Sequence, residues 1–235
     1  MDINYKNIWN ATSHLWYERA LSEHLCMALS PFISILFIKH GVKPNTVTLL
    51  MIIFGVIAPL LFMIDNEWTR VIASILFIFW FVLDCSDGEV ARFTKTFSKH
   101  GADLDYLSHV SCHSLFIMAL WKIFAYQSEH ILPLTILFFA LLSVELFYRL
   151  SVIYSVYRND DQKVEETKIK KRSLKYNILL NLTYFPNFVV IIPGAYCLLK
   201  IIGIDILPFI LSLFVIYIIV KIKQYVMMVI KFYRS

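Results

Sequence analysis

The sequence predicts an all-α integral membrane protein with six transmembrane helices and an N-terminal amphipathic helix in the membrane interface. Of its 235 residues, 59% are hydrophobic and only 17% are charged, which is far from the composition of a soluble domain. Nineteen Phe against six Gly favour helices that pack among lipid tails. No strand alternation is evident, and a bilayer offers no water to open backbone groups, so helices are expected.

The first 40 residues begin as a mixture of apolar and charged side chains and then become more apolar. Trp9 and Trp16 stand among charged residues there, a pattern typical of a helix that lies in the membrane interface. We therefore expect an interfacial helix region over residues 1–40 and a six-helix bundle over residues 41–235. No repeat or low-complexity linker divides the chain, so a single membrane-embedded domain, 1–235, is sufficient.

Six later stretches have the roughly 20 mostly apolar residues that a helix needs to cross a bilayer. Pro186 and Pro193 fall in the fifth stretch and predict a kink there. The predicted spans are residues 45–64, 69–91, 106–126, 131–157, 177–199 and 205–230.

The basic residues predict the orientation of these spans. If the N-terminus is cytoplasmic, eighteen of the 22 Lys and Arg lie in or beside cytoplasmic segments, seven of them between residues 158 and 175. Only Arg70, Lys122 and Lys200 lie near the opposite side, and Arg149 lies within a span. Because cytoplasmic loops carry the positive excess, both termini are predicted to be cytoplasmic.

Four ionisable side chains stand where the second span ends and the third begins: Asp84, Asp87, Asp105 and His109. Such residues are costly at membrane depth and mark functional sites. Asp84 and Asp87 share one helix face, as do Asp105 and His109, so two antiparallel helices can bring all four together. Neighbouring carboxylates repel one another unless a cation neutralises them, and their oxygen atoms suit Mg²⁺ or Mn²⁺. The sequence therefore predicts a metal site at the cytoplasmic mouth of the bundle.

Small residues and one arginine accompany these carboxylates. Gly88 and Ala91 lie on the same side of the second span and remove side-chain bulk where a ligand or a second helix has to approach closely. Arg92 and Gly101 flank the following turn. A guanidinium group beside a metal site is well suited to phosphate oxygens.

The spacing D-x2-D-G-x2-A-R-x8-G-x3-D-x3-(D) resembles that of the CDP-alcohol phosphotransferase family, also called CDP-alcohol phosphatidyltransferase. Seven of its eight positions agree, namely Asp84, Asp87, Gly88, Ala91, Arg92, Gly101 and Asp105. The segment Pro44-Asn45-Thr-Val-Thr48 is similar to the Pro-Asn-x-x-Thr element of the family. With the six spans and the interfacial helix, the resemblance covers essentially the whole chain.

The resemblance implies an enzyme that transfers a substituted phosphoryl group from a CMP-linked donor to an alcohol and releases CMP. It implies that Asp84, Asp87 and Asp105 bind two divalent cations, Mg²⁺ or Mn²⁺, and that Gly88 and Ala91 leave room for cytidine. Its further implied substrate-binding residues are Asn45, Thr48, Arg92 and Gly101.

At the eighth position this sequence has His109, where the family has an aspartate assigned as general base and often as a metal contact. Imidazole can accept a proton near neutral pH or bind a metal through one nitrogen, but it cannot bridge two ions as a carboxylate can. We expect Asp105 and His109 to be catalytic, with His109 acting as base or as metal ligand. The alternative is that His109 contacts neither metal nor substrate and lies beside a degenerate site.

His109 and the short chain favour a specialised bacterial-type branch, in the bacterial cell membrane, over a core phospholipid synthase. The expected donor is small and zwitterionic, either CMP-2-aminoethylphosphonate or CDP-ethanolamine. The expected acceptor is diacylglycerol or a glycan-lipid hydroxyl. Membrane lipids are expected partners, nucleic acid is not, and a homodimer is left open.

Two other interpretations compete with the enzyme. A noncatalytic relative could bind a CDP-alcohol or a metal as a scaffold. An ion-coupled transporter also uses carboxylates within the membrane, but the inverted pair of broken, charged helices typical of that class is not evident. Glu145 and Arg149, four residues apart in the fourth span, predict either a mutually neutralising pair or a head-group contact, and His113 is predicted to be structural.

Overall fold

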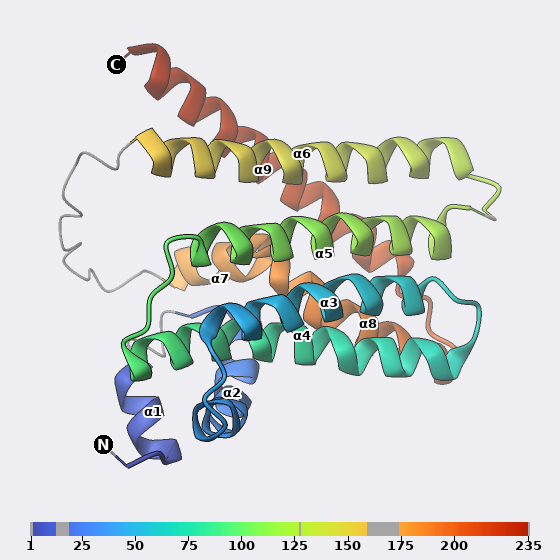
Figure 1. Cartoon of the computed structure of the whole chain (residues 1–235). Helices are drawn as coiled ribbons and strands as arrows, with labels where there is room; N and C mark the ends of the chain where they lie inside the picture. The colour runs from blue at the N-terminus through green and yellow to red at the C-terminus, as the bar shows by residue number, and fades with distance from the viewer. Residues whose placement is uncertain (1, 13–18, 127, 159–173, 235) are drawn as a thin grey trace.

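The computed structural model describes residues 2–12, 19–126, 128–158 and 174–234, and these residues form helices and connections without a strand (Figure 1). Six helices are each long and apolar enough to cross a membrane, and a seventh crossing is formed if the bent pair α7 and α8 counts as one span. The prediction of an all-α integral membrane protein is therefore confirmed. The helices are α1 (Tyr5–Thr12), α2 (Leu21–Lys39), α3 (Pro44–Phe62), α4 (Glu67–Thr94), α5 (Gly101–Phe124), α6 (Ile131–Arg158), α7 (Leu174–Thr183), α8 (Phe185–Ile201) and α9 (Leu207–Arg234).

The N-terminal region contains two helices, α1 and α2. By length and composition α2 could cross a membrane. Figure 1 shows α2 nearly end-on, however, whereas α3, α4, α5 and α6 run across the view, so α2 lies crosswise to the bundle. Its outer face exposes large apolar side chains, and its inner face buries small ones such as Ser30 and Ser34. A crosswise helix with an apolar outer face is the arrangement expected of a helix in the membrane interface.

The fifth predicted span, 177–199, is a broken helix. The axes of α7 and α8 differ by 67°. The break falls at Tyr184, whose backbone is extended, and Pro186 occupies the first turn of α8. Proline fits the first turn of a helix but has no N–H to continue one, which is why the chain restarts there. With this bent pair, the six predicted spans correspond to α3, α4, α5, α6, α7–α8 and α9.

The closest packing in the bundle joins α3, α4 and α5. A Cβ atom on Gly55 would lie 2.8 Å from Nε1 of Trp80 and 3.2 Å from Cβ of Cys112, so only glycine allows this approach. Trp80 is fully buried and donates its Nε1 hydrogen to Oγ of Ser108 over 3.1 Å. α3 therefore packs against both α4 and α5, and the hydrogen bond from Trp80 to Ser108 joins α4 to α5 directly.

The turn between α4 and α5 lies at the end of the bundle that holds the predicted site residues. α4 ends at Thr94 because Lys95 takes a left-handed conformation, with φ of 55°. The connection is short, and α5 begins at Gly101. Figure 1 shows this turn at the same end of the bundle as the start of α3 and both ends of the described chain.

Candidate metal centre and its cavity

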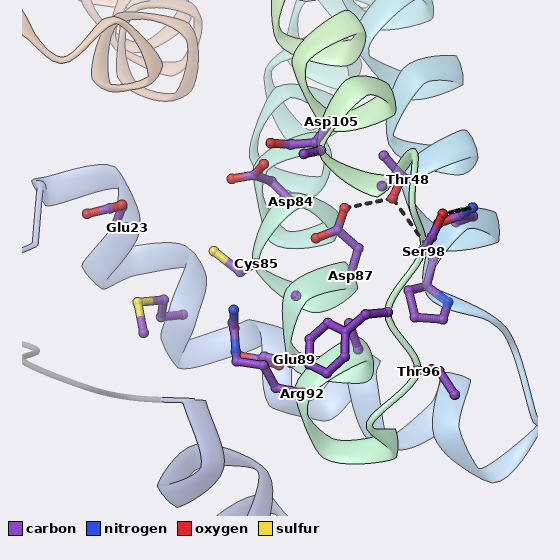
Figure 2. Close-up of a pocket in the computed structure, with 18 of the residues that line it drawn as sticks. Glu23, Thr48, Asp84, Cys85, Asp87, Glu89, Arg92, Thr96, Ser98 and Asp105 are labelled. Atoms are coloured by element: carbon purple, nitrogen blue, oxygen red, sulfur yellow. Dashed lines mark hydrogen bonds between the residues drawn. The ribbon is translucent and has the colours of Figure 1, made fainter. Parts of the chain in front are cut away.

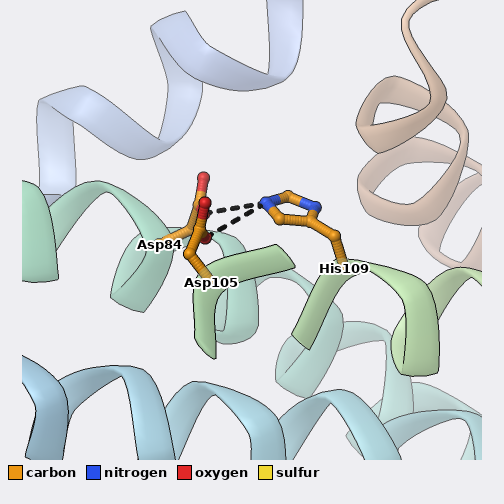
Figure 3. A group of neighbouring side chains, drawn as sticks. All are labelled: Asp84, Asp105 and His109. Atoms are coloured by element: carbon orange, nitrogen blue, oxygen red, sulfur yellow. Dashed lines mark hydrogen bonds and ion pairs between the residues drawn. The ribbon is translucent and has the colours of Figure 1, made fainter. Parts of the chain in front are cut away.

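Asp84, Asp105 and His109 converge between α4 and α5 (Figure 3). Nε2 of His109 lies 2.9 Å from Oδ1 of Asp84 and 3.6 Å from Oδ1 of Asp105. One ligand atom from each of the three residues lies within 4.8 Å of the others. Within the described part of the chain, this is the one group of three or more His, Cys, Asp or Glu side chains with the spacing of a metal site.

The chemistry of this group fits a divalent cation. Oδ1 of Asp105 is buried and has no hydrogen-bond partner. Burying such an oxygen is costly unless a donor or a cation meets it. Carboxylate oxygens with one imidazole nitrogen form a ligand set suitable for Mg²⁺ or Mn²⁺. The three residues could therefore hold one ion between them.

Asp87 lies one helical turn beyond Asp84 but is not part of this three-residue group. Its Oδ2 accepts a hydrogen bond of 2.8 Å from Oγ1 of Thr48, as Figure 2 shows. Thr48 is the fifth residue of α3, which Pro44 starts. Three of the four predicted ligands are therefore brought together, and the fourth is held beside them by α3.

These side chains border a cavity of about 510 Å³. His109 is the one predicted site residue that does not line it; it lies behind Asp84 with 11% of its side chain exposed. The others all line the cavity: Asn45, Thr48, Asp84, Asp87, Gly88, Ala91, Arg92, Gly101 and Asp105.

Gly88 lies beside the guanidinium group of Arg92. A Cβ atom on Gly88 would lie 2.9 Å from Nη2 of Arg92, so the glycine leaves space for the guanidinium group along α4. Asn45 has a partner within the protein, because its Nδ2 donates to Oγ of Ser98 over 2.9 Å. Asn45 thereby ties the start of α3 to the turn between α4 and α5.

The interfacial region supplies cavity residues that the sequence analysis did not single out. Glu23 and Met27 of α2 line the cavity, as does Glu89 of α4. Glu89 is buried and accepts hydrogen bonds of 2.6 Å from the hydroxyls of both Ser30 and Ser34. Serines four residues apart in the otherwise apolar stretch 25–38 are the signal that could have indicated a buried polar partner for α2.

A second group of polar residues lies next to the cluster of Asp84, Asp105 and His109. Nε of Arg149 lies 2.5 Å from Oε1 of Glu145, so the two residues form the neutralising pair that was one of the two predicted options. His113 is fully buried, and its Nδ1 lies 2.8 Å from the same carboxylate oxygen. The hydroxyl group of Tyr217 on α9 donates to Oε2 of Glu145.

A comparison with protein families gives the class to which these features belong. A family model described as CDP-alcohol phosphatidyltransferase matches residues 42–232. A comparison with curated proteins found no match. The matched stretch runs from before α3 into α9, so it contains the cavity turn and all ten predicted site residues. The chain therefore belongs to the CDP-alcohol phosphatidyltransferase family.

Proposed function

We propose that the chain is a divalent-metal-dependent transferase that moves a substituted phosphate or phosphonate group from a CMP-linked donor to an acceptor hydroxyl and releases CMP. The observation that carries this proposal is the cluster of Asp84, Asp105 and His109 at the edge of the cavity between α4 and α5. The membership of a transferase family supports the same reaction class.

The charge of the cavity supports two bound cations. Its lining includes five carboxylates, from Glu23, Asp84, Asp87, Glu89 and Asp105, but only two guanidinium groups. Such a lining would repel the phosphates of a donor unless cations were present. The ions, Mg²⁺ or Mn²⁺, would be held by Asp84, Asp87, Asp105 and His109. Bound there, they supply charge neutralisation for the donor and for the departing CMP.

The protein's own residues would arrange the transfer. Gly88 and Ala91 leave room for cytidine, and Arg92 offers donors to phosphate oxygens. The acceptor oxygen forms a bond to phosphorus while the bond from phosphorus to CMP breaks, and CMP leaves with that electron pair. The proton of the acceptor hydroxyl passes to Nε2 of His109, or His109 binds an ion and Asp105 takes the proton.

The donor that we propose is CMP-2-aminoethylphosphonate or CDP-ethanolamine, and the acceptor is diacylglycerol or a glycan-lipid hydroxyl, in lipid or glycan-lipid biosynthesis. Glu23 supports a donor with a cationic end. It lies on the opposite side of the cavity from Thr48 (Figure 2), where a carboxylate can attract an ammonium group. Glu23 accepts hydrogen bonds from Arg19 over 3.3 Å and from the backbone N–H of Ala20 over 2.8 Å, which hold it in place.

We further propose that the cavity and both termini face the cytoplasm of a bacterial cell. The two ends of the described chain lie at the cavity end of the bundle, which agrees with an even number of crossings by α3 to α9. Lys95 and Lys99 lie in the turn at that end. The predicted basic loop between residues 158 and 175 supports the same side on sequence grounds; its residues 159–173 lie outside the described ranges.

One screen tests the proposed reaction. The purified full-length protein is incubated in detergent or lipid with a panel of CMP-linked donors and acceptors, with Mg²⁺, with Mn²⁺ and with EDTA. We expect metal-dependent CMP release from an aminoalkyl donor, lost in Asp84→Ala. Tight binding of donors without CMP release from any member of the panel would instead support the noncatalytic relative. Metal-independent ion flux in vesicles without CMP release would support the transporter.

A further inference from the structure

The two ring nitrogens of His109 face different surroundings. Nε2 points to the carboxylates of Asp84 and Asp105, as Figure 3 shows. Nδ1 lies 3.5 Å from Nε2 of His113, one turn further along α5. The proton on one ring nitrogen of a neutral imidazole excludes a proton on the other. The partner of Nδ1 therefore influences what Nε2 can do.

His113 has one possible acceptor and one possible donor at its own Nδ1. Oε1 of Glu145 lies 2.8 Å away and can accept a hydrogen bond, whereas Nη2 of Arg149 lies 2.9 Å away and can only donate one. His113 is fully buried, so water does not replace either partner. Both forms of neutral His113 therefore find a partner at Nδ1.

These contacts allow two complete hydrogen-bond arrangements with the same number of protons. In the first, Nε2–H of His109 donates to Asp84, Nε2–H of His113 donates to Nδ1 of His109, and Arg149 donates to Nδ1 of His113. In the second, Nε2 of His109 carries no proton, its Nδ1–H donates to His113, and Nδ1–H of His113 donates to Glu145. The second arrangement is the one in which His109 can bind a cation or accept a proton.

We propose that His113 is a positioning residue that sets the protonated ring nitrogen of His109 and so prepares Nε2 for the metal centre. This inference rests on the metal centre of the proposed function. Glu145 is a fixed acceptor for this purpose, because Arg149, one turn further along α6, and Tyr217 of α9 both donate to it. A hydrogen-bonded partner of this kind orients a metal-binding imidazole and commonly changes metal affinity by about 10–100-fold.

A purely structural role for His113 makes a different prediction. If His113 only fills space beside Trp80 and Phe185, whose ring centroids lie 5.9 and 4.5 Å away, then any side chain of suitable volume should serve. If it acts through hydrogen bonds, an amide should replace it better than an aromatic ring. His113→Gln retains an acceptor for Nδ1–H of His109 and a donor for Glu145, whereas His113→Phe retains neither.

The first test measures Mn²⁺ binding to the purified protein by the loss of the free-ion EPR signal. We expect His113→Phe to weaken binding by about 10–100-fold and His113→Gln to weaken it less. His130→Phe, the same change at an exposed position in the connection between α5 and α6, should bind as wild type. Wild-type affinity in His113→Phe, or equal losses in the Phe and Gln variants, would overturn the inference.

The second test applies even if His113→Phe does not fold. Wild-type protein labelled with ¹⁵N-histidine is studied by NMR at about pH 8, where histidine in water is neutral, with Mg²⁺ as a diamagnetic ion. We expect His109, assigned by loss of its signals in His109→Asp, to carry its proton on Nδ1, with coupling to His113. A proton on Nε2 of Mg²⁺-loaded His109 would overturn the inference. Neither test measures CMP release, so each can support or overturn this inference whether or not the transferase assay succeeds.

Discussion

Thr48 of α3 donates its hydroxyl hydrogen to Oδ2 of Asp87 on α4 over 2.8 Å, and this bond joins the start of one helix to the proposed metal-binding face of another. Thr48→Val, which keeps the shape but loses the donor, should raise the metal concentration needed for half-maximal CMP release by about 10–100-fold. Thr48→Ser should retain most of the affinity. Equal behaviour of the Val and Ser variants would show that the hydroxyl group has no such role.

Loss of a carboxylate from the three-residue cluster should stop the reaction without unfolding the bundle. Asp84→Ala and Asp105→Ala each remove a group that neutralises cationic charge, and we expect CMP release to fall by more than about 100-fold. Folding should persist, because the remaining carboxylates repel one another less. Asp103→Ala is the matched control, since Asp103 pairs with His100 over 3.2 Å and does not line the cavity. Near-normal, metal-dependent activity in Asp84→Ala or Asp105→Ala would contradict the proposed metal centre.

His109 can be tested for its two proposed roles by measuring metal occupancy together with turnover. His109→Ala should lose most turnover. Unchanged occupancy in that variant indicates a base, and loss of one ion indicates a ligand. His109→Asp should retain measurable activity and move the acidic limb of the rate profile to lower pH, because a carboxyl group loses its proton at lower pH than imidazole. Wild-type turnover in His109→Ala would exclude both roles.

The pair of Glu145 and Arg149 should contribute strongly to stability because Glu145 is buried. Glu145→Ala leaves the guanidinium group without its carboxylate and should lower the free energy of unfolding by about 3 kcal/mol. Replacing both residues with Leu should cost less, since no unpaired charge remains. Asp65→Ala is the comparison, because Asp65 pairs with Arg70 over 2.9 Å but is exposed, so its loss should cost less than about 1 kcal/mol. Thermal unfolding in detergent measures all three.

The proposed orientation predicts opposite labelling of the two ends of the bundle. In a background without native cysteines, Lys99→Cys should react with an impermeant thiol reagent only after the cytoplasmic face is opened. Glu129→Cys, exposed in the connection between α5 and α6, should react in intact cells. The reverse pattern would place the cavity on the outer side, away from cytoplasmic CMP-linked donors.

Much of the fold and the centre of the site follow from local sequence pattern. The apolar stretches predicted six spans. The spacing of the four predicted ligands predicted that two antiparallel helices could bring them together, as the structure does for all of them but Asp87. Both depend on helical periodicity within one or two neighbouring helices, which a sequence displays directly. The short turn before Gly101 then leaves little freedom in how α4 and α5 meet.

The remaining features depend on contacts between distant parts of the chain. Nothing local to Glu23 or Met27 indicates that α2 forms a wall of the cavity, because this depends on its crosswise position. His113 was predicted to be structural, and its contacts with Glu145 and Arg149 of α6 depend on how α5 and α6 are rotated against each other, which the sequence does not display. The separation of Asp87 from the three-residue cluster depends on Thr48 of another helix, which is equally a property of the packed bundle.

The crosswise helix α2 is attached to the far half of the chain. Oδ1 of Asn181 accepts the backbone N–H of Leu21 over 2.8 Å, and Oδ1 of Asn187 accepts that of Ser22 over 2.9 Å, so the break between α7 and α8 caps the start of α2. The family match begins at residue 42, after α2 has ended. The cavity is thus bounded partly by a segment that lies outside the shared region yet is docked onto it. If the cavity binds the donor as proposed, α2 can contribute to the choice of donor without any change in the residues of the proposed metal centre.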